Sequence, residues 1–221
     1  MTPSAASVPP HRTRIKLCGF TREPDVAAAL AAGADALGFV FYPPSPRYVS
    51  PARAAELSAR MPPFVTRVGL FVNESPQRVR EILAQTPLDL LQFHGDEDAV
   101  YCSQFARPWI KAARVRPGCD LLEYATAFRG AQGLLLDAFV DGFGGGGATF
   151  DWSLIPLSLP LPTVLSGGLH AENVAEAIRR IRPWAVDVSS GVESDVKGVK
   201  DARKIYEFIS AVRTADAAIS L

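Results

Sequence analysis

The chain has 221 residues, of which 48% are hydrophobic and 21% charged, and its 23 Lys and Arg residues balance its 23 Asp and Glu residues. This composition is ordinary for a globular protein, and a net charge of zero argues against nucleic acid or an anionic membrane surface as a partner. No stretch approaches the roughly 18 to 20 consecutive apolar residues that a membrane-spanning helix needs, so we expect no membrane partner.

The three cysteines, Cys18, Cys102 and Cys119, are an odd number without the spacing of metal ligands. A disulfide framework is unusual in a chain of this size, and free thiols suit a reducing compartment, so we expect a cytoplasmic protein without a metal site. Residues 1–13 are rich in Pro, Ser and Ala, which predicts a disordered N-terminal tail. Residues 14–221 show no break in composition and are expected to form one domain.

Short, continuous apolar runs alternate with helical patterns along this domain. Continuous rather than alternating runs predict strands that are buried on both faces of a parallel sheet. The eight predicted strands are Ile15–Leu17, Ala36–Phe41, Val68–Val72, Leu88–Phe93, Trp109–Ala113, Gly133–Leu136, Thr163–Leu165 and Ala185–Val188.

Helix starts are recognisable between several of these runs. Pro24 is expected to open the first helix. Ser50-Pro51 and Ser75-Pro76 each place a capping hydroxyl before a proline at the first helical position, where the missing N–H is not needed. Two further helices are predicted from apolar residues that repeat on one face: Val174, Ile178 and Ile181, and then Ile205, Phe208, Ile209 and Val212.

Three other segments have weaker helical patterns. The segments after Glu97 and Asp120 are predicted as helices because they lie between predicted strands. The stretch from Trp152 to Pro162 contains three prolines and is expected to hold only about two turns of helix.

Eight strands that alternate with helices predict an α/β fold, a closed (β/α)8 TIM barrel in a single domain. An open, doubly wound sheet is the alternative. That fold normally has a Gly-rich turn after its first strand, and here Cys18-Gly19-Phe20-Thr21 occupies this place.

In such barrels the chemistry lies where strands end and the following loops begin. Asn73, Lys111 and Arg114 also fall there, and we interpret them as ordinary loop polarity. The remaining polar side chains at or just after predicted strand ends are Cys18, Arg47, Gln92, His94, Asp137, Ser166, Asp187 and Ser189.

Two Gly-rich segments follow the seventh and eighth strands, where barrels commonly bind phosphate. They are Ser166-Gly167-Gly168 and Ser189-Ser190-Gly191. Glycines let the backbone approach an oxyanion, and N–H groups and hydroxyls donate to it, so the pair predicts a phosphorylated small-molecule ligand. The glycines at 142 and 144–147, which include Gly145 and Gly146, predict a lid that closes over this ligand.

These motifs together resemble the phosphoribosylanthranilate isomerase family of tryptophan biosynthesis, and the resemblance extends from Arg14 to about Arg213. It rests on Lys16-Leu17-Cys18-Gly19, Gly38-Phe39-Val40-Phe41, Ser45-Pro46-Arg47-Tyr48, Val68 to Asn73, Leu91-Gln92-Phe93-His94-Gly95, Leu136-Asp137, Phe150-Asp151-Trp152, Ser166-Gly167-Gly168-Leu169 and Asp187 to Glu193.

The resemblance implies an Amadori rearrangement without a cofactor, from N-(5-phosphoribosyl)anthranilate to 1-(2-carboxyphenylamino)-1-deoxyribulose 5-phosphate. Asp137 matches the family's general acid and Cys18 its general base, which calls for a protonated carboxyl and a thiolate. Arg47 matches the family's residue that faces the aminobenzoate carboxylate, and Asp187 matches a family position near the bridging amine. Gln92 and His94 are expected to line the same mouth in supporting roles.

Phosphate is implied to lie on the backbone of Gly168, Ser190 and Gly191 beneath the lid. The lid departs from the family pattern, because the usual Gly-Gly-Thr-Gly is Gly144-Gly145-Gly146-Gly147-Ala148-Thr149 here and a nearby lysine is absent. Relatives are monomeric or dimeric, so the sequence predicts a monomer or a homodimer.

Two rival functions remain open. The first is another phosphosugar enzyme, such as a metal-dependent epimerase or an indole-forming synthase that would use Lys111 as its acid. The second is a barrel that only binds a phosphorylated metabolite, and this function would not require Cys18 or Asp137.

Overall fold

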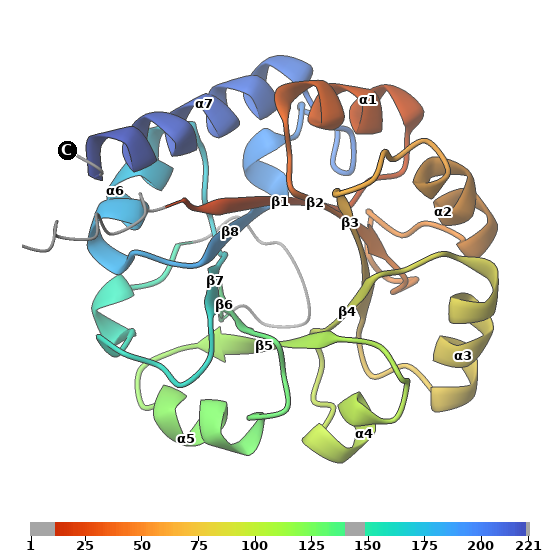
Figure 1. The fold of residues 1–221 in the computed structure, drawn as a ribbon, viewed down its shortest axis with the longest axis horizontal. Coiled ribbons are helices and arrows are strands. Elements are labelled where there is room, and N and C mark those ends of the chain that lie inside the picture. Colours follow the sequence, from red (N-terminus) through yellow and green to blue (C-terminus); the bar gives the residue numbers. More distant parts are fainter. Residues whose placement is uncertain (1–11, 140–148, 220–221) are drawn as a thin grey trace, which may run out of the picture.

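The computed structural model describes residues 12–139 and 149–219, and these form a ring of strands surrounded by helices (Figure 1). The strands are β1 (Arg14–Cys18), β2 (Ala36–Val40), β3 (Thr66–Phe71), β4 (Leu90–Phe93), β5 (Trp109–Val115), β6 (Leu134–Ala138), β7 (Thr163–Leu165) and β8 (Ala185–Val188). The helices are α1 (Glu23–Ala32), α2 (Pro51–Ser58), α3 (Pro76–Gln85), α4 (Ala99–Ser103), α5 (Leu121–Ala127), α6 (Ala171–Ile181) and α7 (Ala202–Ile219), with 3₁₀ turns η1 (Trp152–Leu154) and η2 (Ser190–Val192).

The eight strands form a closed parallel barrel in chain order. β1 closes it by pairing with both β2 and β8, so that Lys16 is the register partner of Ala36 on one side and of Asp187 on the other. The predicted (β/α)8 barrel is therefore confirmed, with each predicted strand present, and the open doubly wound alternative is wrong.

Side chains alternate between the inside of the barrel and the layer beneath the helices. On β1, Ile15 and Leu17 belong to the large core that the helices cover. Lys16 and Cys18 therefore point into the barrel. A separate interior cluster consists of Ile110, Ala112, Leu135, Val164 and Ala185. Apolar residues thus fill part of the interior and leave polar positions near the strand ends.

The helix starts follow the predicted capping chemistry. The Ser50 hydroxyl accepts a hydrogen bond from the backbone N–H of Arg53 at the start of α2, and Ser75 does the same for Arg78 in α3. The aspartates that precede α4 and α5, Asp98 and Asp120, also accept backbone N–H groups. These caps fix where each helix leaves its loop.

The segment before β7 differs from the expectation of about two helical turns. It contains one 3₁₀ turn, η1, in which the side chain of Asp151 accepts a hydrogen bond from Ser153 N at 2.9 Å. Prolines at 156, 160 and 162 remove the backbone donors that a longer helix needs, which is why the helix does not extend.

Residues 1–11 of the predicted tail lie outside the described residues. Thr13 is buried, and its backbone N–H and hydroxyl each bind the Asp216 carboxylate of α7 at 2.7 Å. In the described part of the chain, no helix is long and apolar enough to cross a membrane.

Candidate active site

The residues predicted as acid and base both point into the barrel at the C-terminal ends of their strands. Cys18 is the last residue of β1, and Asp137 precedes the last residue of β6, where Leu135 shares its side of the strand. This is the end at which (β/α)8 barrels carry their chemistry. Each side chain lies in its own polar cluster.

Cys18 is almost completely buried, with 4% of its surface exposed. Gly38 on the neighbouring strand β2 makes room for the thiol, because a Cβ at that position would lie 2.6 Å from Sγ. Below the thiol, Lys16 Nζ lies 2.8 Å from Asp187 Oδ1. Asp187 thus meets an ammonium inside the barrel.

The charges around Cys18 act in opposite directions. Burial raises the pKa of the thiol, Lys16 and Lys200 lower it, and Asp187 raises it further, with a net increase. The thiolate that we expected from the resemblance is therefore not the favoured form at neutral pH. Burial outweighs the two lysines, which sequence patterns alone do not reveal.

Asp137 is linked to the two residues that were expected to support it. Its Oδ2 lies 3.1 Å from His94 Nε2, and Nδ1 of the same ring lies 3.0 Å from Gln92 Nε2. An amide nitrogen only donates, so Nδ1 accepts and the ring carries its hydrogen on Nε2, facing the carboxylate. Gln92 is fully buried and thereby fixes the ring.

Arg47 belongs to a buried charge network. Its Nε and Nη2 donate to Glu193 Oε1 and Oε2 at 2.6 and 2.9 Å, a bidentate pair. Lys200 Nζ donates to the same Oε1 at 3.0 Å. Burial raises the pKa of Glu193, but Arg47 and Lys200 outweigh it and lower that pKa overall. Neither Glu193 nor Lys200 was singled out from the sequence, although Glu193 lies in a motif that carried the resemblance.

This network reaches Cys18 through Ser189. Lys200 Nζ donates to the Ser189 carbonyl at 3.0 Å, and the Ser189 hydroxyl donates to the Cys18 carbonyl at 2.9 Å. Ser189 was predicted as a phosphate ligand, but its hydroxyl is engaged with β1. Any contact that it makes to a phosphate would use its backbone.

The loops after β7 and β8 lie against each other. Gly167 and Gly168 both have positive φ, at 82° and 61°. Gly191, in η2, packs so tightly against the Leu169 carbonyl that a Cβ would collide with it. The two predicted phosphate-binding segments, with Ser166 and Ser190, are thus neighbours beside the start of α6. Gly145 and Gly146 lie outside the described residues.

Lys111, Asn73 and Arg114 have structural contacts. Lys111 alternates with the interior residues Ile110 and Ala112, so it points out of the barrel, where its Nζ binds Gly95 O at 2.6 Å and Glu97 Oε2 at 3.1 Å. Further contacts join Asn73 N to Glu97 Oε1 and Arg114 Nη2 to Asp96 Oδ1. Lys111 therefore does not reach the interior as the synthase alternative requires.

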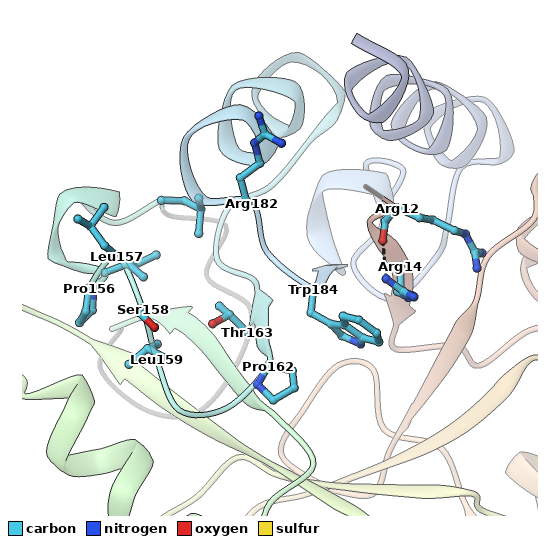
Figure 2. A pocket seen from close by; sticks show the side chains of 12 residues that line it. Arg12, Arg14, Pro156, Leu157, Ser158, Leu159, Pro162, Thr163, Arg182 and Trp184 are labelled. Atoms are coloured by element: carbon cyan, nitrogen blue, oxygen red, sulfur yellow. Dashed lines mark hydrogen bonds between the residues drawn. The ribbon is translucent and has the colours of Figure 1, made fainter. Parts of the chain in front are cut away.

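A cleft of 620 Å³ lies at the other end of the barrel (Figure 2). Arg14 at the start of β1 and Thr163 at the start of β7 line it, and Trp184 stands directly before β8. The Arg14 guanidinium stacks on the Trp184 ring at 3.6 Å from the centroid. This cleft shares no residue with the predicted site. Among the residues that the structure describes, no group of three or more His, Cys, Asp and Glu side chains is arranged to hold a metal ion.

Comparison with known proteins identifies the family. The family model described as N-(5'phosphoribosyl)anthranilate (PRA) isomerase matches residues 15–211. The chain belongs to this isomerase family. A relative from Dechloromonas aromatica, named N-(5'-phosphoribosyl)anthranilate isomerase, is 67% identical over 94% of this chain and 100% of its own length. Another of the same name, from Leptothrix cholodnii, is 60% identical over 94% of each chain.

Solved structures agree with this membership. A phosphoribosyl anthranilate isomerase from Thermotoga maritima superposes with a TM-score of 0.84 at 43% identity, over 91% of this chain and 99% of that one. A further structure, described as phosphoribosyl anthranilate isomerase in complex with reduced 1-(o-carboxyphenylamino)-1-deoxyribulose 5-phosphate, gives 0.81 at 42% identity with the same coverage. The predicted family and the prediction of an isomerase of tryptophan biosynthesis are confirmed.

Proposed function

We propose that the protein isomerises N-(5-phosphoribosyl)anthranilate to 1-(2-carboxyphenylamino)-1-deoxyribulose 5-phosphate, with Asp137 as general acid and Cys18 as general base. The observation that carries the proposal is their placement at one end of one barrel interior, each in its own polar cluster. The family membership supports the substrate, and a relative holds a reduced form of this product.

In the first step Asp137 donates a proton to the ring oxygen of the ribose. The bond between C1 and that oxygen breaks, its electrons stay on the oxygen, and the nitrogen lone pair forms a C1=N iminium. His94 Nε2 lies 3.1 Å from Asp137 Oδ2, so its N–H can donate to the carboxylate that remains after Asp137 has given up its proton. Gln92 keeps the ring in this orientation.

In the second step the thiolate of Cys18 takes the proton from C2. The electrons of the C2–H bond form C1=C2 and those of the iminium return to nitrogen, which gives an enolamine. The enol hydroxyl then loses its proton and C1 gains one, so the product is a ketone and no electrons leave the substrate. Burial of Cys18 makes its thiolate a strong base once it forms, because a raised pKa means higher proton affinity.

Substrate binding is proposed to use three groups of residues. A guanidinium has five N–H donors and the Glu193 pair uses two of them, so Arg47 retains donors for the aminobenzoate carboxylate. Asp187 would lie near the bridging amine. The phosphate would lie on the backbone at Gly167–Gly168 and Ser190–Gly191, at the N-terminus of α6, where helix N–H groups favour an anion.

Turnover of enzymatically generated N-(5-phosphoribosyl)anthranilate by the purified protein, in EDTA and without added cofactor, tests this proposal. We expect loss of substrate fluorescence and formation of the ketone product, identified by mass and by borohydride reduction. A folded protein that binds the reduced product but does not turn over the substrate would support the non-catalytic binding alternative instead.

A second copy of this chain is the partner that we propose. Phe64, Leu157 and Trp184 are large, exposed apolar residues, and all lie in loops that lead into strands, at the end of the barrel away from the site (Figure 2 for the last two). A related structure from Thermotoga maritima concerns monomers made from a dimeric isomerase. Sedimentation of the wild type should show a dimer, and the Phe64→Asp variant should sediment as a monomer. A wild-type protein that stays monomeric at high concentration would contradict the proposed dimer.

A further inference from the structure

Lys16 is a buried cation on the interior side of β1, two residues before Cys18. Its side chain is 6% exposed, and so is that of Asp187, whose Oδ1 lies 2.8 Å from Lys16 Nζ. The two residues are register partners where β1 pairs with β8. Burying two charges costs several kcal/mol per ion before their attraction is counted, so an apolar pair would fill this place at lower cost.

The charges of this pair act on the thiol above it. Lys16 lowers the pKa of Cys18, and Asp187 raises it. Lys200, which forms an ion pair with Glu193, adds a second positive charge from the β8 side. Gly38 faces the thiol from β2 and carries no charge. Burial alone would lower the pKa of Lys16, but Asp187 and Cys18 outweigh burial and raise it, so Lys16 stays an ammonium at neutral pH.

We propose that Lys16 is a positioning residue whose ammonium stabilises the Cys18 thiolate from inside the barrel, and that the charge of Asp187 opposes this effect. The role follows from the proposed function, in which Cys18 takes a proton from C2. A buried thiolate needs a nearby counter-charge, and Lys16 supplies one from the same strand, where the spacing of two residues keeps both side chains on one side. When the proton reaches Sγ, the thiol becomes neutral and Lys16 keeps its pair with Asp187.

The rate at which iodoacetamide alkylates Cys18, followed by peptide mass between pH 6 and 11, reports the thiolate directly. In Lys16→Met we expect the midpoint of this profile to move up by about one pH unit. Lys16→Arg keeps the positive charge and should leave the midpoint close to that of the wild type. A folded Lys16→Met protein with the wild-type midpoint would overturn the proposal.

Asp187→Asn supplies a test in the opposite direction, and it stands even if Lys16→Met fails to fold. Removing the negative charge should move the midpoint down by about one pH unit, because Lys16 then acts on Cys18 alone. A pair that only holds the barrel together predicts no such opposed shifts. An unchanged or raised midpoint in folded Asp187→Asn would contradict the electrostatic role.

The kinetic consequence is a fall of kcat in Lys16→Met by about 10-fold or more with KM nearly unchanged, and the base ionisation in the pH–rate profile should move with the alkylation midpoint. Alkylation needs no substrate, so the two proposals fail separately. Shifted midpoints in a protein without turnover would reject the isomerase function alone. Turnover with unshifted midpoints would reject the role of Lys16 alone.

Discussion

At the scale of single residues, Glu193 is expected to orient Arg47 toward the aminobenzoate carboxylate of the proposed substrate. Glu193→Gln removes one half of the bidentate pair and the partner charge of Lys200. We predict that KM rises about tenfold, equal to about 1.4 kcal/mol of binding, with a smaller change in kcat, because a guanidinium that is free to rotate loses its orientation.

Steady-state kinetics of this variant should be compared with Glu207→Gln, which removes a carboxylate from an exposed pair with Arg203 on α7. The control should behave like the wild type. A lower KM in Glu193→Gln would show that Glu193 competes with the ligand for Arg47 instead of orienting it.

The sequence predicted the positions of the site residues better than it predicted their contacts. Cys18, Asp137 and Arg47 were singled out because each stands at or after the end of a predicted strand in a motif of the family, and the structure has Cys18 and Asp137 at the C-terminal ends of β1 and β6. The state of Cys18 was not predictable, because it depends on burial and on Lys16, Asp187 and Lys200, which come together only in the closed barrel. Glu193 and Lys200 were missed for the same reason.

At the scale of elements, Lys111 joins β5 to the loop between β4 and α4. Its Nζ is buried and binds Gly95 O, Glu97 Oε2 and, at 3.4 Å, Phe93 O. Lys111→Met would leave the buried Glu97 carboxylate without its ammonium, so we predict a loss of about 3 kcal/mol in the free energy of unfolding. Urea denaturation measures this loss.

The double variant Lys111→Met with Glu97→Gln should recover part of the stability, and Arg203→Met at an exposed pair should cost less than about 1 kcal/mol. Turnover of the folded Lys111→Met fraction should persist, because this side chain points away from the barrel interior. A stable Lys111→Met protein that has lost turnover would indicate that Lys111 takes part in the reaction.

Sequence patterns were reliable for the elements that local chemistry determines. Continuous apolar runs predicted all eight strands, and the Ser-Pro pairs predicted the starts of α2 and α3. The segment before β7 was predicted to hold about two turns of helix and contains one 3₁₀ turn, because its three prolines limit helix length even more than we expected.

At the scale of the whole molecule, the buried thiol of Cys102 links global stability to alkaline pH. Burial raises the pKa of Cys102 in α4 to about 12, against about 8.5 in an unfolded chain. The unfolded state therefore ionises first, so stability conferred by the neutral thiol is present below pH ~8.5 and falls as pH rises toward 12.

Between pH 8 and 10 we expect the wild type to lose about 1 to 2 kcal/mol more than Cys102→Ala, although the variant starts from a lower stability because of its cavity. Urea unfolding at several pH values under reducing conditions gives both curves. Parallel curves would show that Cys102 titrates alike in the folded and unfolded states.

The most direct test of the acid–base assignment is to measure turnover and ligand affinity together in Cys18→Ala and Asp137→Ala. Calorimetry with the reduced product, as bound in a related isomerase, gives the affinity, and the fluorescence assay gives kcat. The assignment predicts that both variants bind this ligand within about tenfold of the wild type while kcat falls by about 10²-fold or more. Turnover near the wild-type rate in either folded variant would contradict it.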